Sequence, residues 1–176
     1  MMGPAIRAFH VLINLCFLLY IPVAVSEALP EFRVKAAFVY NFIAFTEWPD
    51  TVGTTLSLCM YGQSPLNEEI DLLQGRRVKE RQIITRKEVG IEDLKNCQIV
   101  FIPNAAINNL PDILNTLSNE PILTIADIKD ASSQGIAISM SAVKNKIRFE
   151  ANLKAAQLAG LDISSKLLRL ATKVYQ

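Results

Sequence analysis

Histidine is almost absent from this sequence. The single histidine among 176 residues is His10, which lies in an N-terminal segment that we expect the mature protein to lose. Without histidine, a protein cannot use Ser-His-Asp or Cys-His catalysis and cannot build a histidine-ligated metal site. The GxGxxG and GxxxxGKS/T motifs are also missing, so neither a dinucleotide site nor a nucleoside triphosphate site is indicated. We therefore predict that the protein is not an enzyme and has no cofactor and no metal.

A surplus of charge is missing as well. The chain has 18 basic and 17 acidic residues, which gives a formal net charge of +1. Because phosphate binding needs a basic surplus, nucleic acid is not expected to be a partner. Hydrophobic residues make up 51% of the chain and charged residues 20%, and these proportions exclude a disordered protein. With 7 glycines and 8 prolines, the chain has no low-complexity linker, so we expect one domain.

Long apolar runs are confined to the N-terminus. Arg7 is the only charged residue before Glu27, and the uncharged, mostly apolar segment 8–26 follows it. Small residues, Ala24 and Ser26, stand at −3 and −1 of a cleavage site after Ser26. This pattern predicts a signal peptide over residues 1–26 and one secreted domain over residues 27–176, without stable membrane insertion after cleavage. A retained anchor is the alternative, because the apolar segment has about the minimum length of a membrane span.

Cysteine is scarce. Only Cys59 and Cys97 remain in the predicted mature chain, and an even pair in an oxidising compartment predicts one disulfide bond. There is no CxxC motif, so a thioredoxin-type redox enzyme is not indicated.

Helical and strand-like segments alternate along the mature chain. Periodicity and capping residues predict helices over 30–48, 64–73, 105–117 (interrupted near Pro111), 153–159 and 163–174. Apolar runs predict strands over 55–61, 82–85, 97–102, 122–126, 135–141 and 146–149, the last two joined by a hairpin at 143–145. Short apolar strands separated by helices are typical of a parallel sheet covered on both faces. The predicted fold is an α/β three-layer sandwich with a mostly parallel mixed sheet, helices on both faces and a C-terminal β-hairpin strand pair.

The predicted helix 30–48 is unusually aromatic. It carries six of the thirteen aromatic residues: Phe32, Phe38, Tyr40, Phe42, Phe45 and Trp48. One stripe at spacings of three and four contains Val34, Ala37, Phe38, Asn41, Phe45 and Trp48, and Val39, Phe42 and Ile43 make the other side apolar too. The simplest interpretation is a core helix buried on more than one face. Alternatively, part of this surface stays exposed and Phe42, Phe45 and Trp48 dock a partner.

Polar residues follow several of the predicted strands. In open α/β sheets, ligands usually bind beyond the carboxyl ends of the strands. The residues at those ends are Gly62, Gln63, Ser64, Asn104 and Asp127. The Gly62–Ser64 segment could cradle an anion at a helix N-terminus, or Ser64 could be an ordinary helix cap. Asp127 and Glu150 both follow apolar strands, but nothing in the sequence places the two carboxylates together.

Several motifs resemble those of a known family. Residues 34–49 read VKAAFVYNFIAFTEWP, and residues 147–171 read IRFEANLKAAQLAGLDISSKLLRLA. Between them lie LCMYG at 58–62, NCQIVFI at 96–102 and PILTIAD at 121–127. These motifs span nearly the whole mature chain, and they resemble the YfiR family of periplasmic proteins.

The resemblance implies a periplasmic α/β protein of Gram-negative bacteria. Its better-understood members repress an inner-membrane diguanylate cyclase by binding the periplasmic sensor part of that enzyme, which lowers cyclic-di-GMP and biofilm formation. The resemblance also implies a disulfide between the cysteines of the LCMYG and NCQIVFI motifs, which are Cys59 and Cys97. Some members have a second disulfide, for which this mature chain has no cysteines left.

Two functions follow as hypotheses. The first is a non-enzymatic periplasmic regulator that binds such a cyclase, with a homodimer as a further assembly to consider. Its interaction surface is expected to include Phe149, Glu150, Asn152, Lys166 and Arg169, although Glu150 could instead complement the dipole of a helix that it opens. The face from Phe42 to Trp48 is the next candidate. The second hypothesis is a periplasmic small-molecule-binding protein that uses the crevice at the strand ends.

Overall fold

Eight strands form one mixed sheet in the computed structural model, which describes residues 28–176. The strands are β2 (Thr55–Tyr61), β3 (Arg77–Val78), β4 (Arg81–Val89), β5 (Ile99–Ile102), β6 (Leu123–Ala126), β7 (Ile138–Val143), β8 (Lys146–Asn152) and β10 (Lys173–Tyr175). Their order across the sheet is β10-β8-β7-β6-β5-β2-β4-β3. The five strands from β7 to β4 in that order run parallel, whereas β3, β8 and β10 run the opposite way. The predicted mostly parallel mixed sheet is confirmed, and the predicted signal peptide lies outside the described residues.

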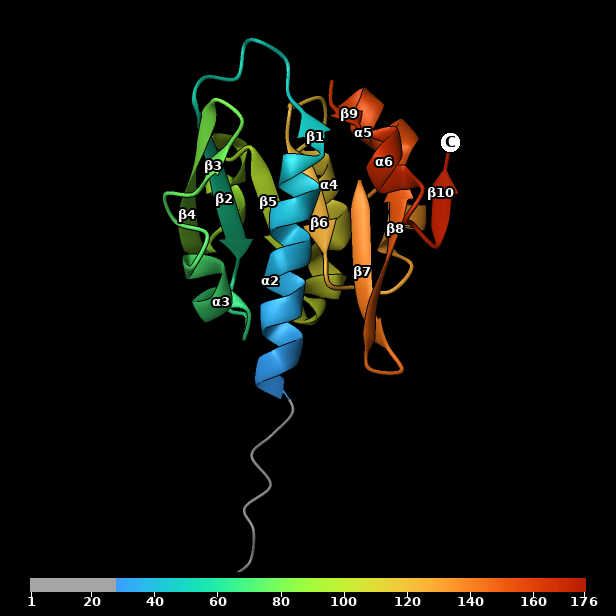
Figure 1. The fold of residues 1–176 in the computed structure, drawn as a ribbon. Helices are drawn as coiled ribbons and strands as arrows, with labels where there is room; N and C mark the ends of the chain where they lie inside the picture. Colours follow the sequence, from blue (N-terminus) through green and yellow to red (C-terminus); the bar gives the residue numbers. More distant parts are fainter. Residues whose placement is uncertain (1–27) are drawn as a thin grey trace, which may run out of the picture.

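The long helix α2 (Ala28–Ala44) crosses one face of the sheet (Figure 1). The short helices α3 (Asn67–Asp71), α5 (Leu153–Leu158) and α6 (Ser165–Leu168) contribute to the same core. Within that core, the Phe42 ring packs 5.0 Å from the Phe149 ring, measured between centroids. Burial of such side chains stabilises the fold by about 1.5–3 kcal/mol each. This core therefore fixes α2 against the hairpin end of the sheet.

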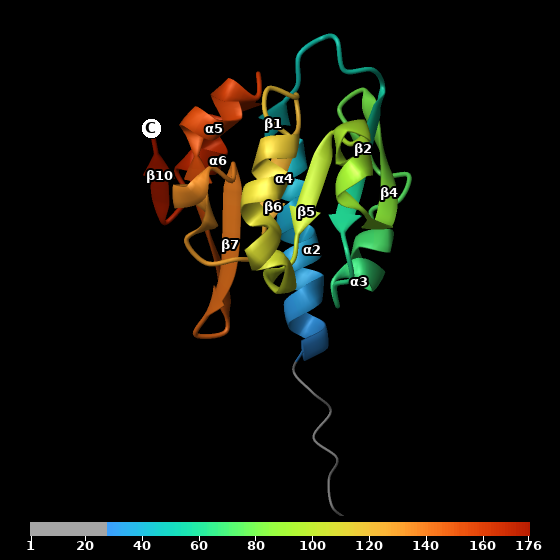
Figure 2. The ribbon, with the colours of Figure 1, turned by 180° about the vertical axis from the view of Figure 1, so that it is seen from behind.

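The opposite face is covered by the helix α4 (Leu110–Thr116) and the 3-10 helices η2 (Ile91–Asn96), η3 (Asn104–Asn109) and η4 (Ala131–Gln134) (Figure 2). A second apolar core lies there, and it contains the disulfide between Cys59 and Cys97, whose Cα atoms are 6.0 Å apart. Pro111 occupies the first turn of α4, where its missing N–H has no cost, and the helical segment is interrupted there as predicted. Helices on both faces of the sheet give the predicted three layers.

Strands β7 and β8 form the predicted hairpin. Its turn consists of Lys144 and Asn145, both with positive φ (50° and 57°), as a two-residue type I′ turn requires. Met140 pairs with Phe149 and faces the core beneath α2, so the alternate residues point to the opposite side of the sheet. On that side the hairpin lies beside α4 rather than beneath it (Figure 2).

The aromatic helix ends earlier than predicted. We expected it to continue to Trp48, but α2 stops at Ala44 and the chain enters a short strand, β1 (Thr46–Glu47). The Thr46 hydroxyl donates to the Phe42 carbonyl at 2.7 Å, which satisfies one of the free carbonyls at the helix end. β1 then pairs with β9 (Asp162–Ile163), more than 100 residues later in the chain. We expected Pro49 to end this helix, but the helix ends before it, where the chain pairs with β9.

The predicted last helix, residues 163–174, is wrong. The structure places β9, the four-residue helix α6 and the edge strand β10 there. The Thr172 hydroxyl and backbone N–H both donate to the Phe149 carbonyl at 2.9 Å, and β10 then pairs with β8. Leu170, whose apolar side chain a helix over 163–174 would place on the same face as Ile163 and Leu167, is 72% exposed. The apolar spacing was helical, but hydrogen bonds to β8 direct the chain into a strand.

Two smaller elements also differ from expectation. The predicted helix 64–73 is reduced to α3, five residues between turns. The predicted short strand 82–85 is β4, nine residues long, and it lies next to the two-residue edge strand β3. The charged residues of β4 are tolerated because the strand is only partly covered.

Candidate functional site

The predicted strand-end site begins where β2 ends. Gly62 has a φ of +63°, a conformation that favours glycine, and its N–H donates to the Val89 carbonyl. Gln63 is exposed, and the Ser64 hydroxyl accepts from the Leu66 N–H at 3.2 Å. Ser64 thus caps the turn before α3 and not the helix itself. With only five residues in α3, this segment has little of the helix dipole that the predicted anion cradle needs.

A buried lysine engages the acidic residue of the crevice. Lys35 of α2 is 5% exposed, and its Nζ lies 2.7 Å from Asp127 Oδ2 and 2.7 Å from Glu31 Oε1. Burial alone lowers the pKa of Lys35, but the hydrogen bonds and charges of Asp127 and Glu31 outweigh it, so the pKa is raised. The Asp127 carboxylate therefore serves to join α2 to the end of β6, and sequence reasoning did not identify this role for Lys35.

The end of β5 is the third strand end of the predicted site, and it carries exposed polar side chains. Asn104 is exposed at the start of η3, and Asn109 at its end donates to the Tyr61 hydroxyl at 2.8 Å. This contact links η3 to the end of β2. The structure thus brings the predicted crevice residues to one end of the sheet, but Ser64 and Asp127 already have partners within the protein.

The aromatic face of α2 is divided between core and solvent. Phe42 is fully buried and Trp48 is 6% exposed, with its indole N–H donating to the Gln98 carbonyl. These two side chains cannot contact a partner in this conformation, because α2 and the sheet cover them. Phe45 is 37% exposed and remains accessible. The buried stripe of α2 contains Ala36, Val39, Phe42 and Ile43, whereas Val34, Ala37, Asn41 and Phe45 of the predicted stripe are exposed.

The C-terminal candidates fall into three settings. Phe149 is buried, so it supports the core instead of offering a contact surface. Glu150 lies within β8 and opens no helix; its Oε2 accepts from the Tyr175 hydroxyl of β10 at 3.2 Å. Asn152 is the N-cap of α5, and its side chain accepts from the Ala155 N–H at 2.8 Å. Lys166 and Arg169, on and just after α6, are exposed.

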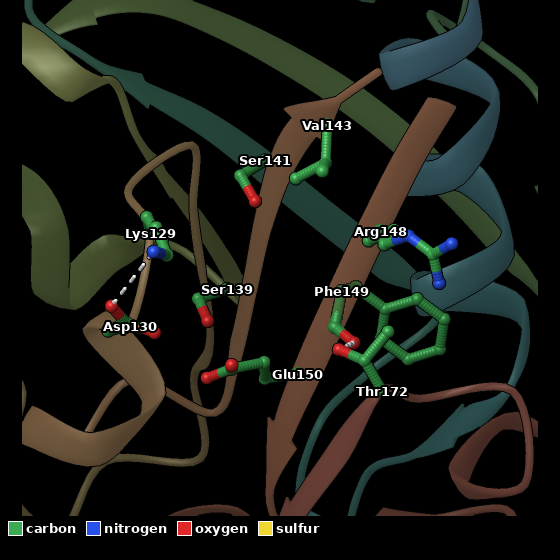
Figure 3. A pocket seen from close by; sticks show the side chains of 9 residues that line it. All are labelled: Lys129, Asp130, Ser139, Ser141, Val143, Arg148, Phe149, Glu150 and Thr172. Carbon is green, nitrogen blue, oxygen red and sulfur yellow. Dashed lines mark hydrogen bonds and ion pairs between the residues drawn. The ribbon is translucent and has the colours of Figure 1, made fainter. Parts of the chain in front are cut away.

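A pocket of about 140 Å³ lies beside the β7–β8 hairpin (Figure 3). Its lining residues come from the loop before η4, from the hairpin and from the position just before β10. They are Lys129, Asp130, Ser139, Ser141, Val143, Arg148, Phe149, Glu150 and Thr172. Figure 3 shows Lys129 and Asp130 on the loop at one side and Arg148 on the strand at the other. Glu150 is the one residue of the predicted interaction surface that combines partial exposure, charge and a place in this pocket.

Basic residues of the hairpin were not singled out from the sequence. Lys146 and Arg148 are exposed on β8, and Lys173 of β10 pairs in register with Glu150. A hydrogen bond that the Lys173 ammonium donates to the Tyr175 side chain is the main cause that raises the pKa of Lys173, and the charge of Tyr175 and those of Glu150 and Asp130 add to it. The signal was available in the sequence as local charge: the segment 129–176 has eight basic and three acidic residues, although the whole chain is nearly neutral.

The described residues lack two features that would have pointed to other functions. Within residues 28–176, no helix has the length and apolarity that a membrane crossing needs. The same part of the chain contains no group of three or more histidine, cysteine, aspartate or glutamate side chains that could hold a metal ion.

Comparisons with known proteins identify a family and a fold. A model of the YfiR/HmsC-like family matches residues 32–172. A solved structure of a conserved domain protein from Vibrio cholerae is 9% identical, with a TM-score of 0.52. An ABC domain in complex with L-Trp from Streptococcus pneumonia is 11% identical, with a TM-score of 0.54. Each comparison covers 81% of this chain and 60% of the solved chain. Because the sequence identities are so low, these comparisons show a shared fold alone.

Proposed function

Because the chain belongs to the YfiR/HmsC-like family, we propose that it is a non-catalytic periplasmic regulator of an inner-membrane diguanylate cyclase. In this role it binds the periplasmic sensor part of the cyclase, represses the enzyme and lowers cyclic-di-GMP and biofilm formation. The observation that carries the proposal is the family match over residues 32–172. The disulfide between Cys59 and Cys97 fits an oxidising compartment such as the periplasm.

The geometry favours protein binding over small-molecule binding. Typical ligand pockets measure roughly 300–1,000 Å³, and the pocket beside the hairpin measures about 140 Å³. The predicted strand-end crevice has less support, because Lys35 already neutralises Asp127 and the Ser64 hydroxyl already accepts a backbone bond. Small-molecule binding at the strand ends therefore remains the second candidate.

We place the partner-binding surface in the C-terminal third of the chain. Glu150 lies half-buried at the pocket, and Lys166 and Arg169 are exposed on the α6 segment. Phe45 is next to this segment, since the Ser164 N–H donates to the Phe45 carbonyl at 2.9 Å. The α6 segment and Phe45 thus combine two cations with one exposed aromatic ring, a composition suited to a protein interface. Glu150 lies on the opposite face of the sheet.

A pull-down of the mature protein from solubilised membranes tests the proposal. The mature chain with a C-terminal tag should capture a diguanylate cyclase from membranes of the native host, identified by mass spectrometry. The Glu150→Ala and Arg169→Glu variants should fold normally and capture less cyclase, whereas the matched variant Lys95→Glu, at an exposed site on η2, should capture as much as the wild type. If no cyclase is enriched above a tag-only control, the proposed function is wrong. If both C-terminal variants capture normally, this surface is wrong.

A further inference from the structure

One face of the β7–β8 hairpin is polar, and only its end at Ser139 is covered, by η4. We call this surface the hairpin face and define it by the residues that point away from α2: Ser139, Ser141, Val143, Lys146, Arg148 and Glu150. Their neighbours on the other side, Met140 and Phe149, belong to the core. On β10, Lys173 is in register with Glu150 and so points to the same side. Apart from the buried Ser139, the hairpin face is therefore an open sheet surface with hydroxyl, basic and acidic groups.

Three basic side chains of the hairpin have no partner among the described residues. Within the described residues, Lys144, Lys146 and Arg148 form no ion pair and no side-chain hydrogen bond. Figure 3 shows the Arg148 guanidinium directed away from the Glu150 carboxylate. At the other end of the sheet, Lys79 pairs with Glu47 at 2.6 Å and Lys87 pairs with Asp71 at 2.6 Å, whereas Arg86 forms no ion pair within the described residues.

This concentration of positive charge is not explained by folding. The segment 129–176 holds eight basic residues, namely Lys129, Lys144, Lys146, Arg148, Lys154, Lys166, Arg169 and Lys173. It holds only three acidic residues, namely Asp130, Glu150 and Asp162. Unpaired like charges repel one another and lower the stability of the folded state. An acidic partner would remove this repulsion on binding.

The spacing of the cations matches an extended segment. Lys146 and Arg148 are two residues apart on β8, so their Cα atoms are separated by about 6.6 Å. Carboxylates on alternate residues of an extended peptide have the same period. The Arg148 guanidinium can bind one carboxylate through two parallel hydrogen bonds. The pocket of about 140 Å³ beside it holds roughly five waters' volume at ~30 Å³ each, which is room for a side chain but not for a larger ligand.

We propose that the hairpin face binds an extended acidic segment of a protein partner, with Lys146 and Arg148 contacting its carboxylates. Val143, 39% exposed near the turn, adds an apolar contact. The identification of that partner with the cyclase sensor rests on the proposed function. A protein segment fits better than an anionic membrane, because Asp130 and Glu150 interrupt the basic surface and would repel a uniform layer of lipid phosphates.

The first test uses nuclear magnetic resonance on the isotope-labelled mature protein. The probes are a short peptide of alternating glutamate and threonine and, separately, phosphatidylglycerol vesicles. Peptide addition should shift backbone amide signals of residues 138–150, and the shifts should disappear in about 1 M salt, where the Debye length is about 3 Å. Shifts centred elsewhere, or no shifts with either probe, overturn the inference. A hairpin response to the vesicles but not to the peptide overturns it in favour of a membrane surface.

The second test uses matched charge reversals. The K146E/R148E variant should bind the peptide at least tenfold more weakly than the wild type. The control R86E/K95E carries the same change in charge at two exposed basic residues outside the hairpin and should bind as the wild type does. If K146E/R148E fails to fold, K146Q/R148Q removes the charge with less disturbance and should also bind more weakly. Equal binding by the hairpin variant and the control overturns the inference.

Capture of the cyclase separates this inference from the proposed function. If the wild type captures no cyclase but binds the peptide through the hairpin, the proposed function fails and the inference holds. If the wild type and K146E/R148E capture equal amounts of cyclase, the proposed function holds and the inference fails.

Discussion

Lys35 shows how a single buried charge can organise this fold. It lies on the sheet side of α2 and binds Asp127, which is 92 residues away in the sequence. The pair joins the N-terminal half of α2 to the carboxyl end of β6. A charged residue on the buried side of a helix is tolerated only when such partners satisfy it.

Lys35→Met should destabilise the protein by about 1.5–3 kcal/mol, because hydrogen bonds between the ammonium and two carboxylates are lost while the aliphatic part of the side chain is retained. Urea unfolding of the mature domain measures the effect. Lys95→Met, at an exposed lysine on η2, is the matched control and should change the free energy of unfolding by less than about 0.5 kcal/mol. Equal effects of the two substitutions would show that the Lys35 contacts contribute nothing.

The same comparison has a defined pH dependence. The folded state raises the pKa of Lys35, so its contribution is fully present below the ordinary lysine value of about 10.4. It is lost as the pH rises through the higher folded-state pKa. The difference in unfolding free energy between the wild type and Lys35→Met should therefore be constant from about pH 7 to 9 and shrink above about pH 10.4. A difference that grows with pH would contradict this account.

The disulfide bond between Cys59 and Cys97 crosslinks two segments within the second core. The bond closes a loop with a sequence separation of 38, which is worth about 4 kcal/mol in the chain-entropy model. The double substitution Cys59→Ala/Cys97→Ala should lower the free energy of unfolding by about 2–4 kcal/mol, measured in urea. Mass spectrometry of the unreduced, unfolded wild type should detect no free thiols. Two alkylated cysteines in that sample would exclude the bond.

Among the elements, the hairpin turn carries a conformational cost that a substitution can remove. Asn145 has a φ of 57°, and type I′ turns strongly prefer glycine at this position. Asn145→Gly should stabilise the domain by about 0.4–1 kcal/mol in thermal or urea unfolding. The control is Asn108→Gly, in a 3-10 helix without positive φ, which should not stabilise. A loss of stability in Asn145→Gly would mean that the Asn145 side chain contributes more than its backbone strain costs.

Elements defined by local sequence were predictable, and those defined by distant contacts were not. The runs at 55–61 and 122–126 identified β2 and β6, because apolar strands between helices have few alternatives. The helix predicted over 163–174 was wrong. The apolar residues of this segment have a helical period, but β10 forms because it pairs with the free edge of β8. Local patterns carry no information about such an edge.

The candidate site was predictable only in part for the same reason. The position of Asp127 at a strand end followed from the sequence, but its partner Lys35 lies 92 residues away. Both sides of α2 are apolar, so the sequence could not decide which stripe faces the sheet. The structure buries Phe42 and leaves Phe45 exposed. The basic hairpin was overlooked because the net charge of the whole chain conceals the charge of its last third.

At the scale of the whole molecule, lysines at the two ends of the sheet differ in their pairing. Near β3 and β4, lysines such as Lys79 and Lys87 are paired with carboxylates. At the β8–β10 end, Lys146 and Arg148 have no partner within residues 28–176. These unpaired cations are open to a partner of opposite charge. It supports the proposal that the C-terminal third of this YfiR/HmsC-like protein is its binding surface.

Intracellular cyclic-di-GMP in a deletion strain tests the central claim most directly. Deletion of the gene should raise the nucleotide level while the partner cyclase is expressed, because repression is lost. Reintroduction of the wild-type gene should restore the low level, and deletion of the cyclase as well should prevent the rise. A cyclic-di-GMP level that is unchanged in the single deletion, with the cyclase shown to be present, would contradict the account.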